Sequence, residues 1–181
     1  MEKSEVKDFL ISVLVLLFIF SIDNLSLRVN ILPYLIFYVV ISYFPRILIS
    51  KYFSKKIGYY STFKLYPLSS FLSISLSFIG VKLALPGYNE ILPFKFSKWK
   101  YSEFKPSVVE IGKISLLVSL YNIFLSTISL LLEISILKDI NAWIAFSNLL
   151  PVLPFEGAKI LRWNFGIWST MFIFTTFLLI L

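Results

Sequence analysis

The side chains that could do chemistry in this chain are few, because its 181 residues include no histidine and no cysteine. Histidine is the commonest general base and metal ligand near neutral pH, and cysteine supplies the thiolate nucleophile. Their absence excludes a serine–histidine protease and any thiol enzyme. The remaining candidates are charged residues in or beside apolar runs, namely Arg46, Lys82, Glu133 and Glu156.

Two protease chemistries need only residues that the chain has. An aspartyl intramembrane protease requires two facing aspartates within the membrane, whereas Asp8, Asp23 and Asp139 fall at or near the ends of apolar runs. A serine–lysine dyad stays formally open, but no particular pair stands out among the many serines. Glu133 and Lys82 could be functional charges within the membrane, but each has a simpler interpretation. Glu133 fits a helix end near Lys138, and the Lys82 side chain can reach lipid headgroups.

Composition indicates an integral membrane protein. Hydrophobic residues make up 58% of the chain, and its mean hydropathy is +0.86, which is too apolar for a soluble domain of this size. The net charge of +7 comes from lysines and arginines in short loops, the pattern of cytoplasmic membrane loops. We therefore expect the lipid bilayer as a partner and no nucleic acid.

Apolar runs predict an all-α polytopic membrane protein with about five or six membrane segments. A spanning helix needs about 20 residues, and the candidate runs lie at 9–22, 30–50, 114–137, 140–153 and 166–181. We expect residues 1–181 to form a single membrane domain, with 1–28 as the first membrane segment and 29–181 as its core.

Residues 65–86 are apolar but have an unusual pattern. Ser73, Ser75 and Ser77 alternate with apolar residues, a period of two that is typical of extended chain. Basic clusters at 51–64 and 95–113 flank this segment, and both can be cytoplasmic only if the chain enters the membrane and returns. We predict a re-entrant, partly extended segment over 65–95, with an ordinary serine-containing spanning helix as the alternative.

The stretch 141–159 resembles the NxxPxPxxDG region of the site-2 protease family of intramembrane zinc metalloproteases, especially its small archaeal members. Asn148, Pro151 and Gly157 stand at matching positions. Pro154 falls one place after the family's second proline, and Glu156 replaces the aspartate.

Three further blocks resemble the family in the same order along the chain. Residues 51–60 resemble the segment after the HExxH helix, 84–87 a small-residue Pro-Gly turn, and 110–116 the EYGKISLAGPxxN block, here without its Gly-Pro. The resemblance covers roughly residues 40–181. It implies a site-2 protease-like core, and its archaeal style implies the plasma membrane. The positive-inside tendency places the basic loops on the cytoplasmic side.

The resemblance also implies a zinc site that this sequence does not support. In the family, the two histidines of HExxH bind zinc, and its glutamate acts as the general base. The later aspartate is the third zinc ligand. Arg46, Ile47 and Ser50 stand where the first histidine, the glutamate and the second histidine belong. One carboxylate, Glu156, is left of a set that needs three ligands, so we expect no zinc and no other cofactor.

Arg46 and Glu156 occupy positions whose family counterparts touch the same metal. We hypothesise that an Arg46–Glu156 ion pair replaces the zinc, and a separation above about 6 Å would reject it. The alternative is an arginine that reaches out to lipid headgroups.

These observations favour a non-catalytic pseudoprotease that binds or scaffolds another membrane protein. Two alternatives remain: an active metallopeptidase that uses unusual or partner-supplied ligands, and a small transporter or channel component.

Overall fold

The computed structural model describes residues 3–23, 26–27, 32–92, 94–97, 100–103 and 106–181. Within them, the helices are α1 (Lys3–Ser21), α2 (Leu32–Ile57), α3 (Pro67–Ser77), α4 (Val108–Leu131), α5 (Ser135–Leu149), α6 (Glu156–Trp163) and α7 (Phe165–Ile180). The strands are β1 (Ile22–Asp23), β2 (Ser26–Leu27), β3 (Tyr60–Leu65), β4 (Gly87–Leu92), β5 (Phe94–Ser97) and β6 (Lys100–Glu103), and they pair antiparallel as β1–β2, β3–β4 and β5–β6.

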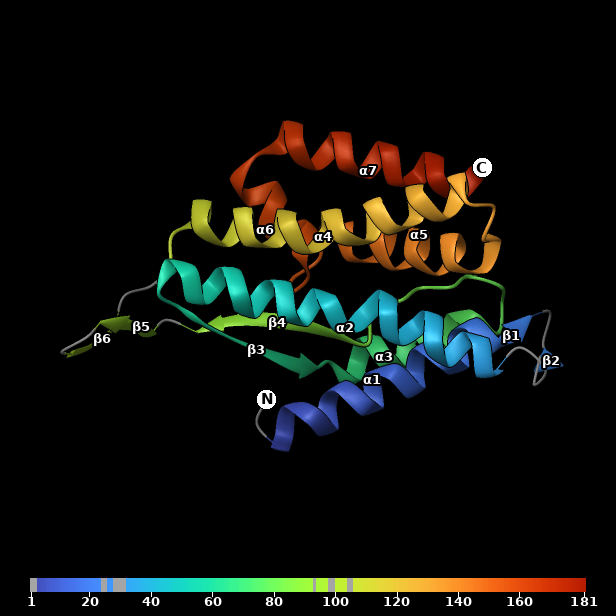
Figure 1. The fold of residues 1–181 in the computed structure, drawn as a ribbon, viewed down its shortest axis with the longest axis horizontal. Helices are drawn as coiled ribbons and strands as arrows, with labels where there is room; N and C mark the ends of the chain where they lie inside the picture. The colour runs from blue at the N-terminus through green and yellow to red at the C-terminus, as the bar shows by residue number, and fades with distance from the viewer. Residues whose placement is uncertain (1–2, 24–25, 28–31, 93, 98–99, 104–105) are drawn as a thin grey trace.

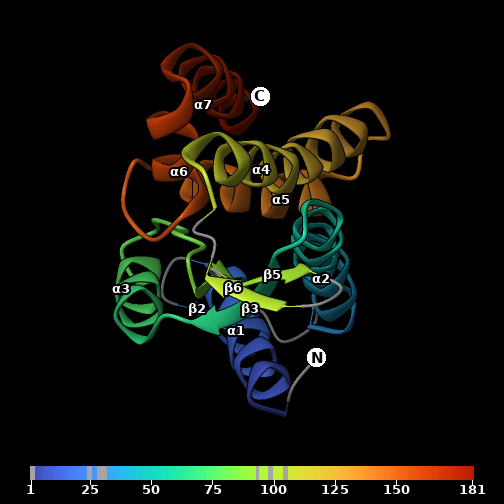
Figure 2. The same ribbon diagram turned by 90° about the vertical axis from the view of Figure 1, so that its left-hand side faces the viewer.

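The elements stack in layers (Figure 1). Helix α7 covers one side of the group formed by α4, α5 and α6, and α2 lies against the opposite side of that group, next to β3 and β4. Figure 2 shows α2 and α3 on either side of the small β3–β4 sheet, with α1 below it. The sheet therefore lies inside a helical shell, and its neighbours decide what its strands can contact.

The prediction of five or six membrane segments is wrong. In the described part of the chain, two helices are long and apolar enough to cross a membrane, α2 with 26 residues and α4 with 24. Helix α1 carries four charged residues in its first two turns, and α5 and α7 have 15 and 16 residues, fewer than the ~20 that a span requires. Apolar composition alone overestimated the number of spans.

The prediction of extended chain is also wrong for the serine-rich segment, because residues 67–77 form the short helix α3. The buried serines are Ser69, Ser70, Ser73 and Ser77, which recur at helical spacing, whereas Ser75 is exposed. Ser69 and Ser70 donate to the carbonyls of Leu85 and Pro86 and so hold the returning chain against α3. Strand β4 then pairs with β3 from Tyr60↔Leu92 to Leu65↔Gly87, which brings the ends of the segment together.

Helix α2 is joined to its neighbours by buried polar contacts. Pro45 lacks an N–H group, so the Ile41 carbonyl loses its helical partner and accepts instead from the Tyr121 hydroxyl of α4 at 2.6 Å. Asn122 of α4 donates to Asn141 Oδ1 of α5 at 2.8 Å and to the Ser42 carbonyl at 2.9 Å. These contacts fix how α2 faces the rest of the molecule.

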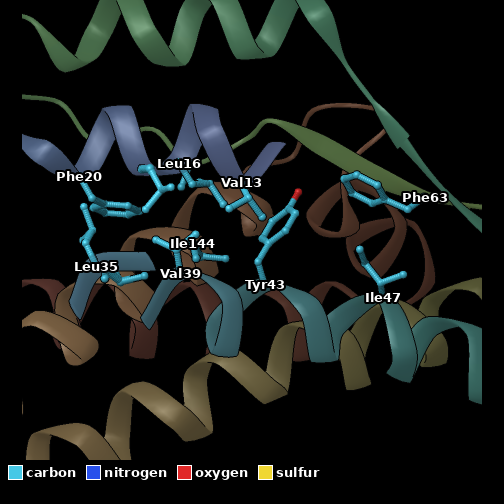
Figure 3. Packing of buried hydrophobic residues seen from close by; sticks show 12 residues of the cluster. Val13, Leu16, Phe20, Leu35, Val39, Tyr43, Ile47, Phe63 and Ile144 are labelled. Atoms are coloured by element: carbon cyan, nitrogen blue, oxygen red, sulfur yellow. The ribbon is translucent and has the colours of Figure 1, made fainter. Parts of the chain in front are cut away.

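The core beside this junction is apolar. Figure 3 shows residues from α1, α2, β3 and α5 meeting around Tyr43, including Val13, Phe63 and Ile144. The rings of Tyr43 and Phe63 meet edge to face with centroids 5.7 Å apart, a favourable aromatic geometry. Position 46 lies one turn further along α2.

Candidate functional site

One face of α2 carries the three positions at which the sequence analysis placed the altered HExxH motif. Arg46 and Ser50 are four residues apart, so they lie on the same side of the helix, and both are buried. Ser50 Oγ lies 2.8 Å from Ser61 Oγ of β3. Ile47 packs into the apolar core, where it lies on the same side of α2 as Tyr43 and Phe63 (Figure 3). Position 47 therefore faces the apolar core of the protein.

Arg46 meets Glu156, the first residue of α6. Its Nη2 atom lies 3.6 Å from Glu156 Oε2, inside the 6 Å limit set from the sequence, and the two side chains are 4% and 1% exposed. The carboxylate lies in the first turn of α6, where the helix dipole favours negative charge. The structure thus brings together two residues that are 110 positions apart in the chain.

Three other residues surround this ion pair. The Arg46 guanidinium carbon lies 5.2 Å from the centre of the Tyr43 ring, within cation–π range. Asn89 of β4 donates from Nδ2 to Glu156 Oε1 at 3.4 Å, and Lys159 of α6 donates to the Asn89 carbonyl at 2.8 Å. Burial lowers the pKa of Lys159, and the Glu156 charge opposes that shift.

The ion pair is incompletely hydrogen-bonded within the described residues. Arg46 Nε, Glu156 Oε2 and Asn89 Oδ1 are buried and make no hydrogen bond there. A buried polar atom without a partner carries a desolvation cost of about 1–3 kcal/mol. The site is therefore polar, buried and energetically unfavourable compared with an apolar core.

The turn between α5 and α6 positions Glu156. Asn148 is buried and donates to the Ile144 carbonyl at 2.8 Å, whereas Pro151 is exposed. Leu153–Pro154 is a cis peptide bond. Gly157 packs so closely on the end of α5 that a Cβ there would overlap the Leu149 carbonyl and lie 2.6 Å from Leu150 O. Of the predicted site residues, Arg46 and Glu156 contact each other, whereas Pro151 is exposed.

These residues do not fit a zinc ion. Zinc hydrolases use three nitrogen, carboxylate or thiolate ligands and one open position, and the chain has no histidine or cysteine. No group of three acidic side chains that could hold a metal occurs among the described residues. The Glu156 carboxylate instead faces the Arg46 guanidinium, at 3.6 Å.

Sequence reasoning missed Tyr43, Asn89 and Lys159. Tyr43 had a usable signal, since it precedes Arg46 by three residues and so shares its helix face. Asn89 had none, because it reaches the site through strand pairing. Glu133 lies in the exposed turn after α4 with φ 58°, and Lys138 pairs with Asp139 at 2.9 Å.

Comparison with known proteins gives one informative relationship. No family model matches the chain, and no solved structure matches it. The chain is 30% identical over 181 aligned residues to a Methanocaldococcus jannaschii protein named "Putative zinc metalloprotease MJ0611", and the alignment covers 93% of this chain and 88% of that protein. An identity of this size over nearly the full length of both proteins indicates common ancestry, so the chain belongs to the metalloprotease-like family of that archaeal protein.

Proposed function

We propose that this chain is a membrane-inserted member of its family that has lost metal-dependent hydrolysis and binds a segment of another membrane protein. The observation that supports this most directly is the buried Arg46–Glu156 pair, at 3.6 Å. A guanidinium that holds the lone carboxylate repels a divalent cation and competes for the oxygen atoms that would bind it.

The proposed binding surface is the turn that leads into Glu156. Val152 and Leu153 are 54% and 51% exposed, and Pro151 beside them is exposed as well. Phe155, two residues after Leu153, is buried and anchors the turn. An exposed apolar tip on a rigid base suits contact with an apolar helix.

Metal analysis tests the loss of hydrolysis. Purified protein should contain far less than one zinc ion per chain after incubation with zinc, and it should not cleave a membrane-protein substrate. The triple variant Arg46→His/Ile47→Glu/Ser50→His restores the ligand types and serves as a positive control for zinc retention. Stoichiometric zinc and hydrolysis in the parent chain would overturn the proposal and favour an active peptidase with unusual ligands.

Photo-crosslinking tests the binding surface. A crosslinking residue at Val152 should give a reproducible adduct with a membrane protein, and Leu153→Asp should abolish it. The same residue at Val6, which is 41% exposed on α1, provides the control for non-specific capture. Equal adducts from both positions would reject the turn as the docking surface.

We place the end that carries Lys55, Lys56 and Lys113 on the cytoplasmic side of the plasma membrane, following the positive-inside tendency. The cysteine-free sequence makes this easy to test, because an introduced thiol is the only one present. A membrane-impermeant maleimide applied outside intact cells should label Glu133→Cys, in the turn after α4, and spare Lys55→Cys. The opposite labelling pattern would reverse the orientation.

A further inference from the structure

An apolar groove lies between α2 and α4, separate from the Arg46–Glu156 pair. Its volume is about 510 Å³, and its walls include Ile49 and Phe53 of α2 and Leu117, Leu120 and Phe124 of α4. Leu120 and Phe124 are 40% and 65% exposed, so the groove opens at the surface. The Tyr121 hydroxyl, which could make the groove polar, is bonded to the Ile41 carbonyl.

The register of the two helices places one end of this groove. Asn122 contacts the Ser42 carbonyl, and further along Tyr59 donates to Glu110 at 3.1 Å. The helices therefore run antiparallel, as Figure 1 also shows. The Tyr59–Glu110 contact places the C-terminal end of α2 beside the first turns of α4, so Lys56 and Lys113 both lie towards this end of the groove.

Both lysines lie on the faces that line the groove. Lys56 follows Phe53 by three residues, and Lys113 precedes Leu117 by four, and these spacings keep side chains on one side of a helix. Both are exposed, and neither forms a salt bridge within the part of the chain that the structure describes. Lys51, on another face of α2, is by contrast paired with Glu5.

We propose that this groove binds an anionic phospholipid, with the phosphate between Lys56 and Lys113 and an acyl chain along Ile49, Phe53, Leu117 and Phe124. Within the described residues, α2 and α4 are the helices long and apolar enough to cross a membrane. In the proposed arrangement the groove faces acyl chains, and its basic end lies at headgroup depth. A zwitterionic lipid brings its own cation to the two ammonium groups and is held less tightly.

This inference rests on the membrane insertion proposed above but not on the loss of hydrolysis. A partner helix is the competing occupant. Such a helix would need an acidic residue level with Lys56 and Lys113, whereas every anionic phospholipid brings negative charge at that depth.

Lipid binding to the delipidated protein, measured by native mass spectrometry with phosphatidylglycerol and phosphatidylcholine as probes, tests the site. We expect the parent to favour phosphatidylglycerol by roughly thirtyfold, since each of the two lysines near the headgroups contributes about 1 kcal/mol and every 1.4 kcal/mol is about tenfold. Lys56→Gln/Lys113→Gln should abolish this preference. Leu120→Trp, which fills the groove, should weaken binding of both lipids.

Lys3→Gln/Lys7→Gln is the matched control, because it removes the same charge from exposed positions of α1. An equal loss of preference in this control, or no preference in the parent, would overturn the inference. So would a crosslinker at Phe124 that captures protein instead of lipid in native membranes. If alkaline carbonate releases the protein from membranes, the proposed insertion fails; if the protein is retained without lipid preference, the groove assignment alone fails.

Discussion

Helix α2 carries two ion pairs that differ in burial and in how well their atoms are satisfied. Lys51 Nζ lies 2.5 Å from Glu5 Oε2, and Glu5 Oε1 accepts from the Phe63 backbone N–H at 2.9 Å. Arg46 and Glu156 are 3.6 Å apart, and Arg46 Nε and Glu156 Oε2 make no hydrogen bond within the described residues. Lys51 is also 23% exposed, whereas the Arg46 side chain is 4% exposed.

The difference separates an ion pair whose atoms are well satisfied from the ion pair at the candidate functional site. Glu5 joins α1 to α2 and to the outer edge of β3, where the neighbouring Asp8 accepts from the Leu65 N–H at 3.2 Å, so each charge has a clear role in packing. The Arg46–Glu156 pair is costly to bury and only partly compensated. Polar groups that a fold satisfies poorly are expected at functional sites, and the Arg46–Glu156 pair has this character.

The largest predicted effect comes from breaking the Arg46–Glu156 pair on one side. Glu156→Ala leaves a guanidinium buried without a counter-charge, which should lower the free energy of unfolding by about 3–5 kcal/mol. Chemical denaturation of the protein in detergent micelles measures the loss.

The double variant Arg46→Met/Glu156→Leu provides the comparison for this prediction. It removes both charges and fills the space with apolar atoms, so it should be as stable as the parent or more stable. A double variant as unstable as Glu156→Ala would mean that the pair itself stabilises the fold, contrary to the comparison above.

The second effect tests the well-satisfied pair. Lys51→Met should cost about 1.5–3 kcal/mol, the value of a hydrogen bond to a charged group. The loss is smaller than at Glu156 because Glu5 keeps its bond from Phe63, and because Met retains most of the apolar stem. Lys55→Met, an exposed position on the same helix, is the control in the same denaturation experiment and should leave stability nearly unchanged. If Lys51→Met lowers the free energy of unfolding more than Glu156→Ala does, the Lys51–Glu5 pair is the more important of the two for stability, contrary to this prediction.

A third variant moves Glu156 without changing its charge. Gly157→Ala places a Cβ against the Leu149 carbonyl, so α6 must shift away from α5, at a cost of about 1–3 kcal/mol. Gly166→Ala is the control, since its nearest neighbour would be Asn164 Oδ1 at 3.3 Å and little must move. If the two variants are equally stable, the packing of α6 on α5 does not position Glu156.

Contacts of the candidate site are predictable from the sequence where a local spacing or a family resemblance indicates them, and not where the partners are far apart in the chain without such a signal. The shared face of Arg46 and Ser50 follows from helical spacing, and the contact between Arg46 and Glu156 was inferred from family resemblance. The role of Glu5 had no local signal, because its partners Lys51 and Phe63 lie 46 and 58 residues away. From the sequence, Glu5 belongs to a charged N-terminal segment, yet it is 2% exposed.

The errors in the predicted fold have two physical sources. Counting apolar runs ignored the charges of α1 and the short lengths of α5 and α7, and so gave too many spans. The alternation from Ser73 to Ser77 predicts extended chain, whereas in the structure Ser69, Ser70, Ser73 and Ser77 form one buried helical face. Serines can take buried positions otherwise held by apolar residues, and Ser69, Ser70 and Ser77 do so while donating to nearby carbonyls. This hides the helical period from a hydrophobicity pattern.

The smallest predicted effect on stability concerns the Lys64–Glu90 ion pair, which is more exposed than the two ion pairs of α2. Lys64 Nζ lies 2.6 Å from Glu90 Oε2, with side chains 49% and 35% exposed. The contact with the Glu90 carboxylate raises the pKa of Lys64 above its usual value, so the folded state favours the charged form. This stabilisation is complete below pH 10.5 and is lost as the pH rises through the folded pKa.

Glu90→Gln should therefore cost at most about 1 kcal/mol near neutral pH. The difference in free energy of unfolding between parent and variant should shrink in strong salt and disappear in denaturation experiments at alkaline pH. A gap that persists above the folded pKa would show that Glu90 acts through packing and not through its charge.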